Sequence, residues 1–317
     1  MILNFSNSKI LVVGDLMLDK YYYGNVNRIS PEAPVPIVNV KTEACTLGGA
    51  GNVANNLANL GCSVFLIGCT GRDQNAQLLQ KILQEKGIDF YLLERASVPT
   101  IAKLRVLGEK QQMLRIDFEE KLNLNLTEEN IIRNEIIPKI KTVDLVILSD
   151  YDKGIFSPNL TQIIINECKL RNVKVIVDPK GKNWNKYNGA NIVTPNFKEF
   201  SEIINLVIPE NDDEKIKSYG FDLMKNNDIE TLLITRSERG MTLLHDKNSI
   251  NIPTIAKEVY DVSGAGDTVI ATLGAALASN YDLVTSVKLA NIAAGLVVGK
   301  LGTSPVNLLE LQGNFKI

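Results

Sequence analysis

The sequence has 317 residues, of which 45% are hydrophobic and 22% charged, so it is that of a globular protein large enough for one main domain and a small appendage. Its 34 basic and 36 acidic residues give a net charge of −2, which provides no overall attraction to nucleic acid or to an anionic membrane. No apolar run is long enough for a membrane span or a signal peptide, so we expect a cytoplasmic protein with no nucleic-acid or membrane partner.

The first predicted element is a buried strand at Lys9–Gly14, a short apolar run that ends in glycine. Asp15 and Asp19 follow in a predicted turn. Carboxylates at the end of a central strand can accept hydrogen bonds from sugar hydroxyls. Turn and capping chemistry explains either aspartate equally well.

Residues 20–42 break the pattern of the main domain. Pro31, Pro34 and Pro36 lie within six residues, which excludes a helix and allows only extended edge structure. We therefore expect a small β-element that projects from the main sheet as a lid.

A second part of this lid is predicted at residues 98–118. Thr100–Leu107 and Met113–Phe118 have the composition of a hairpin. Arg105 and Arg115 could face an anion there, although solvated arginines on strand faces are commoner.

A glycine-rich turn, Leu47–Ala54, precedes a helix that Gly61 closes. Gly49-x-Gly51-x-x-Ala54 matches the dinucleotide-binding fingerprint of dehydrogenases. That fingerprint needs a strand running directly into its first glycine, and Glu43–Thr46 is not predicted to be a strand end. A turn that presents Asn52 to a polar ligand fits better.

From Ser63 onward, strand-like apolar runs alternate with helical stretches. The predicted strands are 64–67, 143–148, 173–177, 192–194 and 231–235, the helices are 74–85 and 157–171, and a hairpin covers 241–252. This alternation predicts an α/β fold with a mainly parallel sheet, helices on both faces, and ligands at the carboxyl ends of the strands. Polar clusters follow four of these strands, at 149–154, 178–180, 195–199 and 236–240. Caps and turns explain each cluster singly but not their common position.

A glycine turn opens the last amphipathic helix, predicted at 265–279. Gly264, Ala265 and Gly266 would leave backbone N–H groups at the positive helix end open to a phosphate. Asp267 then lies where a general base for a hydroxyl that attacks phosphorus is needed. A simple turn with a favourable acidic residue remains the plainer interpretation of this stretch alone. Gly295-x-x-x-Gly299-Lys300-Leu301 is one residue short of a P-loop and lacks its Ser or Thr.

Three motifs together resemble those of the ribokinase-like (PfkB) carbohydrate kinases, in order and over nearly the whole chain. They are Gly48-Gly49-x-x-Asn52, Asn196-x-x-Glu199 and Asp261-x-x-Gly264-Ala265-Gly266-Asp267. The stretches 28–36, 103–107, 149–154 and 298–304 resemble one branch of this family, the D-glycero-β-D-manno-heptose 7-phosphate kinases. The resemblance implies a ribokinase-like doubly wound α/β fold in a single domain, 1–317, with a β-lid formed by about 20–42 and 98–118.

For the activity, the resemblance implies ATP- and Mg²⁺-dependent phosphorylation of the heptose 7-phosphate at its anomeric C1 hydroxyl. The product is the 1,7-bisphosphate on the route to ADP-heptose and the lipopolysaccharide core. Many members of this branch carry an adenylyltransferase domain after the kinase domain. The sequence is too short for one, and with only His245 it lacks the H-x-G-H motif of that domain, so a stand-alone kinase is implied. A homodimer through the lid is also implied. The alternatives are a kinase for another sugar or sugar phosphate, and a non-catalytic sensor of sugar phosphate or nucleotide, against which the intact Asp267 argues.

Residue roles follow from the same resemblance and from side-chain chemistry. Asp267 is implied as the base, with Gly264, Ala265 and Gly266 donating backbone N–H groups to the phosphoryl group. The expected nucleotide-site residues are Asn196, Phe197, Lys198, Glu199, Arg236, Gly240 and Asn291, with Glu199 holding Mg²⁺ through water. The expected sugar-site residues are Asp19, Gly48, Gly49 and Asn52, together with Arg105, Lys153 and Lys180, which are chosen as cations for the 7-phosphate.

Overall fold

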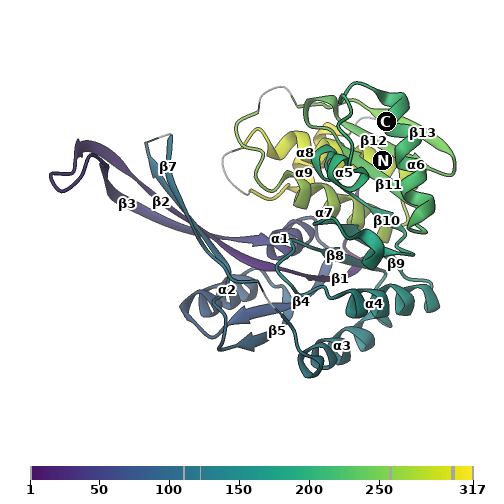
Figure 1. The fold of residues 1–317 in the computed structure, drawn as a ribbon, viewed down its shortest axis with the longest axis horizontal. Helices are drawn as coiled ribbons and strands as arrows, with labels where there is room; N and C mark the ends of the chain where they lie inside the picture. Colours follow the sequence, from purple (N-terminus) through teal and green to yellow (C-terminus); the bar gives the residue numbers. More distant parts are fainter. Residues whose placement is uncertain (1, 110, 122, 257–258, 301–303, 316–317) are drawn as a thin grey trace.

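A large, mainly parallel sheet forms the centre of the structure, a computed structural model that describes residues 2–109, 111–121, 123–256, 259–300 and 304–315 (Figure 1). In spatial order its strands are β13 (Asn248–Ile252), β12 (Met241–His245), β11 (Thr231–Thr235), β10 (Ile192–Val193), β9 (Lys174–Asp178), β8 (Leu145–Ser149), β1 (Lys9–Gly14), β4 (Ser63–Gly71) and β5 (Asp89–Arg95). From β5 at one edge, through β4, β1, β8, β9 and β10, to β11, each strand is parallel to the next. Strand β12 is antiparallel to β11, and β13 is antiparallel to β12. The predicted βα alternation and the hairpin at 241–252 are therefore confirmed.

Helices cover both faces of this sheet. They are α1 (Ala50–Asn59), α2 (Gln74–Glu85), α3 (Leu126–Ile140), α4 (Pro158–Leu170), α5 (Phe197–Ile204), α6 (Asp213–Asn226), α7 (Ala265–Ala278), α8 (Leu283–Val297) and α9 (Leu308–Asn314). Strand β1 shows why both faces are filled: Ile10 and Val12 pack in one core with α1, α7 and α8, while Leu11 and Val13 pack in the other with α3 and α4. Successive side chains of a strand point to opposite faces, so a strand buried on both sides is a continuous apolar run.

A second, four-stranded sheet projects from the main body (Figure 1). Its order is β3 (Pro36–Gly49), β2 (Leu16–Ile29), β6 (Ala102–Gly108) and β7 (Gln111–Phe118). The prediction of a small β-sheet from two separate pieces is confirmed, including the β6–β7 hairpin.

Two details predicted around this small sheet are wrong. Asp19 does not lie in a turn, because β2 begins at Leu16, immediately after Asp15, and continues through Asp19. Glu43–Thr46 is strand, because β3 runs directly into Gly49. Pairing of β2 with β3 and β6, which are distant in sequence, decides both conformations. The dinucleotide fingerprint still lacks its context, since β3 is antiparallel to β2 in the small sheet rather than part of a parallel βαβ unit.

Two stretches named from the sequence extend beyond the described residues. The stretch 298–304 includes residues 301–303, which lie outside the described residues, and Gly295–Leu301 ends at the first of these three. Within the described ranges, none of the helices combines the length and apolar character needed to cross a membrane.

Candidate active site

Asp267 is a buried carboxylate in the first turn of α7. Gly264 is the N-cap, with a left-handed φ of 78°, and it has no side chain to cap the helix. The Asp267 side chain is 3% exposed and accepts two hydrogen bonds, from Asn52 Nδ2 at 2.8 Å and from the Tyr151 hydroxyl at 2.7 Å. Burial raises the pKa of Asp267 to about 6, although both hydrogen bonds favour the charged form. The carboxylate is therefore ionised at neutral pH and weakly basic, as a general base requires.

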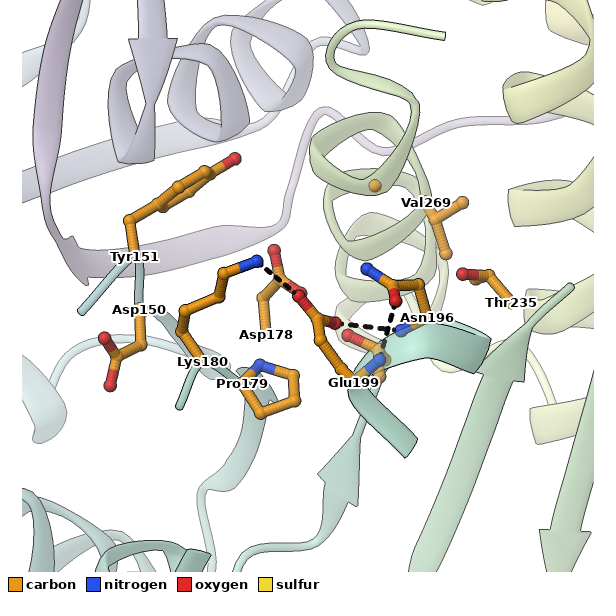
Figure 2. A pocket seen from close by; sticks show the side chains of 11 residues that line it. Asp150, Tyr151, Asp178, Pro179, Lys180, Asn196, Glu199, Thr235 and Val269 are labelled. Atoms are coloured by element: carbon orange, nitrogen blue, oxygen red, sulfur yellow. Dashed lines mark hydrogen bonds and ion pairs between the residues drawn. The ribbon is translucent and has the colours of Figure 1, made fainter. Parts of the chain in front are cut away.

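The start of α7 opens toward a cleft at the carboxyl ends of the central strands. Gly266 is exposed, and a Cβ added to it would meet no atom within 4 Å. The cleft is lined by Asp150, Tyr151, Asp178, Pro179, Lys180, Thr194, Asn196, Glu199, Thr235, Gly266 and Val269 (Figure 2). The helix end thus leaves room for an anion to approach backbone N–H groups.

Asn196 and Glu199 form a capping box at the start of α5. Asn196 Oδ1 accepts from the Glu199 amide at 2.9 Å, and Glu199 Oε2 accepts from the Asn196 amide at 3.0 Å. The second carboxylate oxygen of Glu199 pairs with Lys180 Nζ at 2.8 Å, as Figure 2 shows. Asp178 lies beside this pair, and its pKa is raised well above its ordinary range by burial and by the charge of Glu199. This wall of the cleft therefore holds two neighbouring carboxyl groups, one paired with Lys180 and the other kept toward its neutral form.

The glycines of the first motif make room for neighbouring aspartates. A Cβ on Gly48 would lie 2.5 Å from Asp19 Oδ2, and a Cβ on Gly49 would lie 2.5 Å from the Asp15 carbonyl oxygen. Gly49 also has a φ of 56°, which favours glycine. The motif therefore lets β3 approach β2 closely and brings Asn52, at the start of α1, to Asp267.

Basic side chains of the small sheet lie near Asp19. Arg105 donates to Asp19 Oδ1 at 2.6 Å, and its guanidinium lies 5.3 Å from the ring centre of Tyr21. Lys103 lies two residues earlier on the same face of β6, with its Nζ 5.9 Å from the ring centre of Tyr151. Burial lowers the pKa of Lys103, although the charge of Asp19 opposes this shift.

The remaining predicted residues are spread around the cleft. Lys180 lines it, whereas Lys153 Nζ pairs with Glu119 at 2.8 Å and Lys198 is exposed beside Glu202 on α5. Phe197 packs against the core.

Three predicted nucleotide-site residues have structural partners. Arg236 is 4% exposed and donates to Thr242 Oγ1 at 2.8 Å. Asn291 donates to the Pro253 carbonyl at 2.7 Å. Gly240 has a φ of 78°, and a Cβ there would collide with the Ile252 carbonyl.

The prediction of the site omitted Lys103, Tyr151 and Asp178. Strand alternation from Arg105 would have found Lys103. Tyr151 follows β8 and Asp178 is the last residue of β9, so both belong to predicted polar clusters at the carboxyl ends of parallel strands, which was the available signal.

A buried acid at the open end of a helix, above the carboxyl ends of parallel strands, is an arrangement suited to phosphoryl transfer. The family model of the pfkB family carbohydrate kinases matches residues 7–309, so the chain belongs to that family and is a carbohydrate kinase.

Curated relatives are close in sequence but longer. The chain is 45% identical over 309 residues to the bifunctional protein HldE of Histophilus somni and 46% identical to that of Actinobacillus succinogenes, and these matches cover 97% of the chain. It spans 64% and 63% of the length of these two relatives.

Solved structures share the fold. Phosphofructokinase-2 of Escherichia coli in complex with potassium superposes with a TM-score of 0.78 at 19% identity, covering 96% of this chain and 97% of that one. Ribokinase of Arabidopsis thaliana complexed with ribose and ATP gives a TM-score of 0.76 at 21% identity, covering 98% and 99%.

Proposed function

We propose that this kinase transfers the γ-phosphoryl group of ATP to the anomeric C1 hydroxyl of D-glycero-β-D-manno-heptose 7-phosphate. The C1 oxygen attacks the γ-phosphorus, the bond to the bridging oxygen of ADP breaks, and the hydroxyl proton passes to Asp267. The products are ADP and the 1,7-bisphosphate, a precursor in ADP-heptose and lipopolysaccharide core biosynthesis. The choice of heptose rests on the branch-like stretches in the sequence and is supported by the similarity to HldE proteins.

The observation that carries this proposal is the setting of Asp267. Its two carboxylate oxygens are held by Asn52 and Tyr151, and its pKa of about 6 keeps it ionised at neutral pH. The adjacent N-terminus of α7 would supply donors for a phosphoryl group through Gly264, Ala265 and Gly266, of which the Ala265 amide donates to the Val262 carbonyl at 3.2 Å in this structure and would have to exchange that partner. A protein that only binds sugar phosphate has no need of such a base.

The cleft wall at α5 fits ATP with Mg²⁺. Among the described residues, no three His, Cys, Asp or Glu side chains lie close enough to form a complete metal cage. Mg²⁺ is usually held by one or two carboxylates, waters and substrate phosphates, so this arrangement suits it. Glu199 would hold the ion through water, and a bound Mg²⁺ would neutralise charge on the phosphates. Asn196, Phe197, Lys198, Arg236, Gly240 and Asn291 are proposed around the nucleotide.

The sugar phosphate is proposed to lie between Asp267 and the small sheet. Asp19 and Asn52, with Gly48 and Gly49 behind them, would contact the sugar. Arg105, Lys153 and Lys180 remain the proposed cations for the 7-phosphate. We add Lys103, which has no ion pair among the described side chains within 4 Å. Lysine and arginine bind phosphate through charge-assisted hydrogen bonds.

The small sheet is proposed to act as the lid and as a dimer interface. On β7, Leu114, Ile116 and Phe118 are 53%, 38% and 48% exposed, and they alternate with Arg115, which faces the same side as Arg105. An apolar face on an edge strand favours burial against a second copy. A Leu114→Glu, Ile116→Lys variant should sediment as a monomer, and an unchanged oligomer would place the interface elsewhere. We propose a cytoplasmic enzyme, where ATP is available.

The decisive experiment is ATP consumption by the purified protein with Mg²⁺ and a sugar panel. The panel contains the heptose 7-phosphate, unphosphorylated heptose, fructose phosphates and ribose, with Asp267→Asn as the blank. Turnover confined to the heptose 7-phosphate, with the new phosphate at C1, is expected. Turnover with another sugar would keep the chemistry and reject the substrate, and ligand binding without any turnover would favour a sensor.

A further inference from the structure

The segment after β8 is anchored by a buried carboxylate of the first strand's end. Asp15 is 3% exposed, and its side chain accepts from the amides of Tyr151 at 2.9 Å, Lys153 at 3.0 Å and Ile155 at 3.4 Å. Three donors on one carboxylate fix the backbone of residues 151–155. The direction of the Tyr151 side chain is therefore determined by an interaction that lies outside the substrate site.

The Tyr151 side chain connects this anchor to Asp267. Its hydroxyl donates to Asp267 Oδ1 at 2.7 Å, while Lys103 Nζ lies 5.9 Å from the ring centre. Burial and the charge of Asp267 raise the pKa of Tyr151 well above its ordinary value, so the hydroxyl keeps its proton and remains a donor.

We propose that Tyr151 is a positioning residue for Asp267, and that Asp15 acts through the backbone of residues 151–155 to hold the tyrosine in place. The hydroxyl fixes one carboxylate oxygen, Asn52 fixes the other, and both oxygens retain a lone pair for the substrate proton. This inference rests on the proposed role of Asp267 as the base. It assigns the tyrosine of the Ser149–Gly154 cluster to the geometry of the base and not to substrate binding.

The charges that face Asp267 come from several elements. Asp19 on β2 and Asp178 on β9 disfavour its ionised form, whereas Lys103 on β6 favours it. The hydrogen bonds from Tyr151 and Asn52 are the other favourable contributions. Removing the Tyr151 hydroxyl therefore weakens ionisation while the charged neighbours stay in place.

Tyr151→Phe tests the inference, with Tyr187→Phe as a matched control. Tyr187 also donates from a buried hydroxyl to an aspartate, Asp150 Oδ2 at 2.7 Å, and Asp150 is not among the main groups that shift the pKa of Asp267. The readout is the ratio of variant to wild-type kcat/KM between pH 5 and pH 8.5. A sugar phosphate itself titrates near pH 6, and taking the ratio cancels this common contribution.

We expect the Tyr151→Phe ratio to be about tenfold lower at pH 5 than at pH 8.5. This corresponds to an upward shift of about one pH unit in the acid limb, which is the low-pH part of the kcat/KM profile where activity is lost as the base is protonated. The Tyr187→Phe ratio should not change with pH. A pH-independent ratio for Tyr151→Phe, or the same slope for both variants, would overturn the inference. If Tyr151→Phe does not fold, 3-fluorotyrosine at position 151 is a stronger donor of the same shape, and the limb should then move to lower pH.

A second readout does not require turnover. The carboxyl ¹³C resonance of Asp267, assigned by its loss in Asp267→Asn, should titrate at higher pH in Tyr151→Phe than in wild type. A shifted resonance in a protein that phosphorylates no sugar would reject the proposed function and leave the Tyr151–Asp267 coupling standing. An unshifted resonance in an active enzyme would reject the coupling alone.

Discussion

Replacement of Asp267 by asparagine should remove activity and at the same time change how stability depends on pH. Without a carboxylate to take the hydroxyl proton, phosphoryl transfer should fall by about 10²-fold or more. ATP binding should persist, because the N-terminus of α7 and the capping box of α5 are untouched. A coupled assay of ADP release measures the first effect, and calorimetric titration with ATP measures the second.

The effect on stability follows from the pKa of Asp267. Burial raises it from an ordinary 3.8 to about 6, so the native state holds its proton more tightly than the unfolded chain. The ionised carboxylate therefore opposes folding above pH 6 by roughly 3 kcal/mol, and it contributes no such penalty below pH 4. Asparagine cannot ionise and removes this penalty.

Asparagine also introduces a cost that does not change with pH. Its amide oxygen can accept from Asn52 Nδ2, but its amide nitrogen then faces the Tyr151 hydroxyl, whose proton loses the acceptor that Asp267 provides. A buried donor left without an acceptor costs about 1–3 kcal/mol. Because this term is constant, it shifts the stability difference between the proteins but not its slope with pH.

Urea titrations of both proteins between pH 4 and pH 7 isolate that slope. The free energy of unfolding of the variant, relative to wild type, should rise by roughly 3 kcal/mol over this range. Asp282→Asn is a control whose stability difference should stay nearly flat over this range, because the Thr285 hydroxyl and amide lower the pKa of Asp282, so that it titrates below pH 4. A difference for Asp267→Asn that stays flat with pH would show that the buried carboxylate carries no such penalty.

Three further substitutions test the other parts of the site. Gly266→Ala should fold normally, since its Cβ meets no atom within 4 Å, but it should lower kcat/KM about tenfold or more by obstructing the phosphate. Gly313→Ala, equally unobstructed in α9, is the control and should leave kcat/KM unchanged, and equal activity of the two variants would remove Gly266 from the phosphate site. Gly48→Ala should lower the free energy of unfolding by about 1–3 kcal/mol and raise KM for the sugar, because its Cβ would lie 2.5 Å from Asp19 Oδ2; a variant with wild-type urea midpoint and KM would contradict this close packing. Lys103→Met should raise KM for the phosphorylated sugar about tenfold and leave KM for ATP unchanged, and a shift in both constants would argue against a phosphate contact.

The parts of the molecule that could be predicted from sequence are those fixed by local chemistry. Lys9–Gly14 is a strand buried on both faces, and its unbroken apolar run showed this directly. The glycine turn before Asp267 likewise determines a helix start without help from distant residues. The conformation around Asp19 depends instead on pairing with β3 and β6, which the sequence of β2 does not reveal.

The contacts of the base show the same limit. Asn52 and Tyr151 reach Asp267 across 215 and 116 residues of chain, and only the packing of α1 on α7 and the order of β8 beside β1 bring them together. A motif can indicate that an acid is present, but the groups that set its pKa belong to the tertiary structure.

The join between the two sheets has a mechanical consequence. The chain passes from β1 of the large sheet to β2 of the small one through the single residue Asp15, and β3 ends at Gly49, next to Ala50 of α1, whose amide donates to the Asp15 carbonyl at 3.0 Å. These two strands of the small sheet therefore share one pivot. The Asp15 side chain also accepts a hydrogen bond from the Tyr151 amide. A rotation of the small sheet about this join would therefore also displace Tyr151 and its hydrogen bond to Asp267.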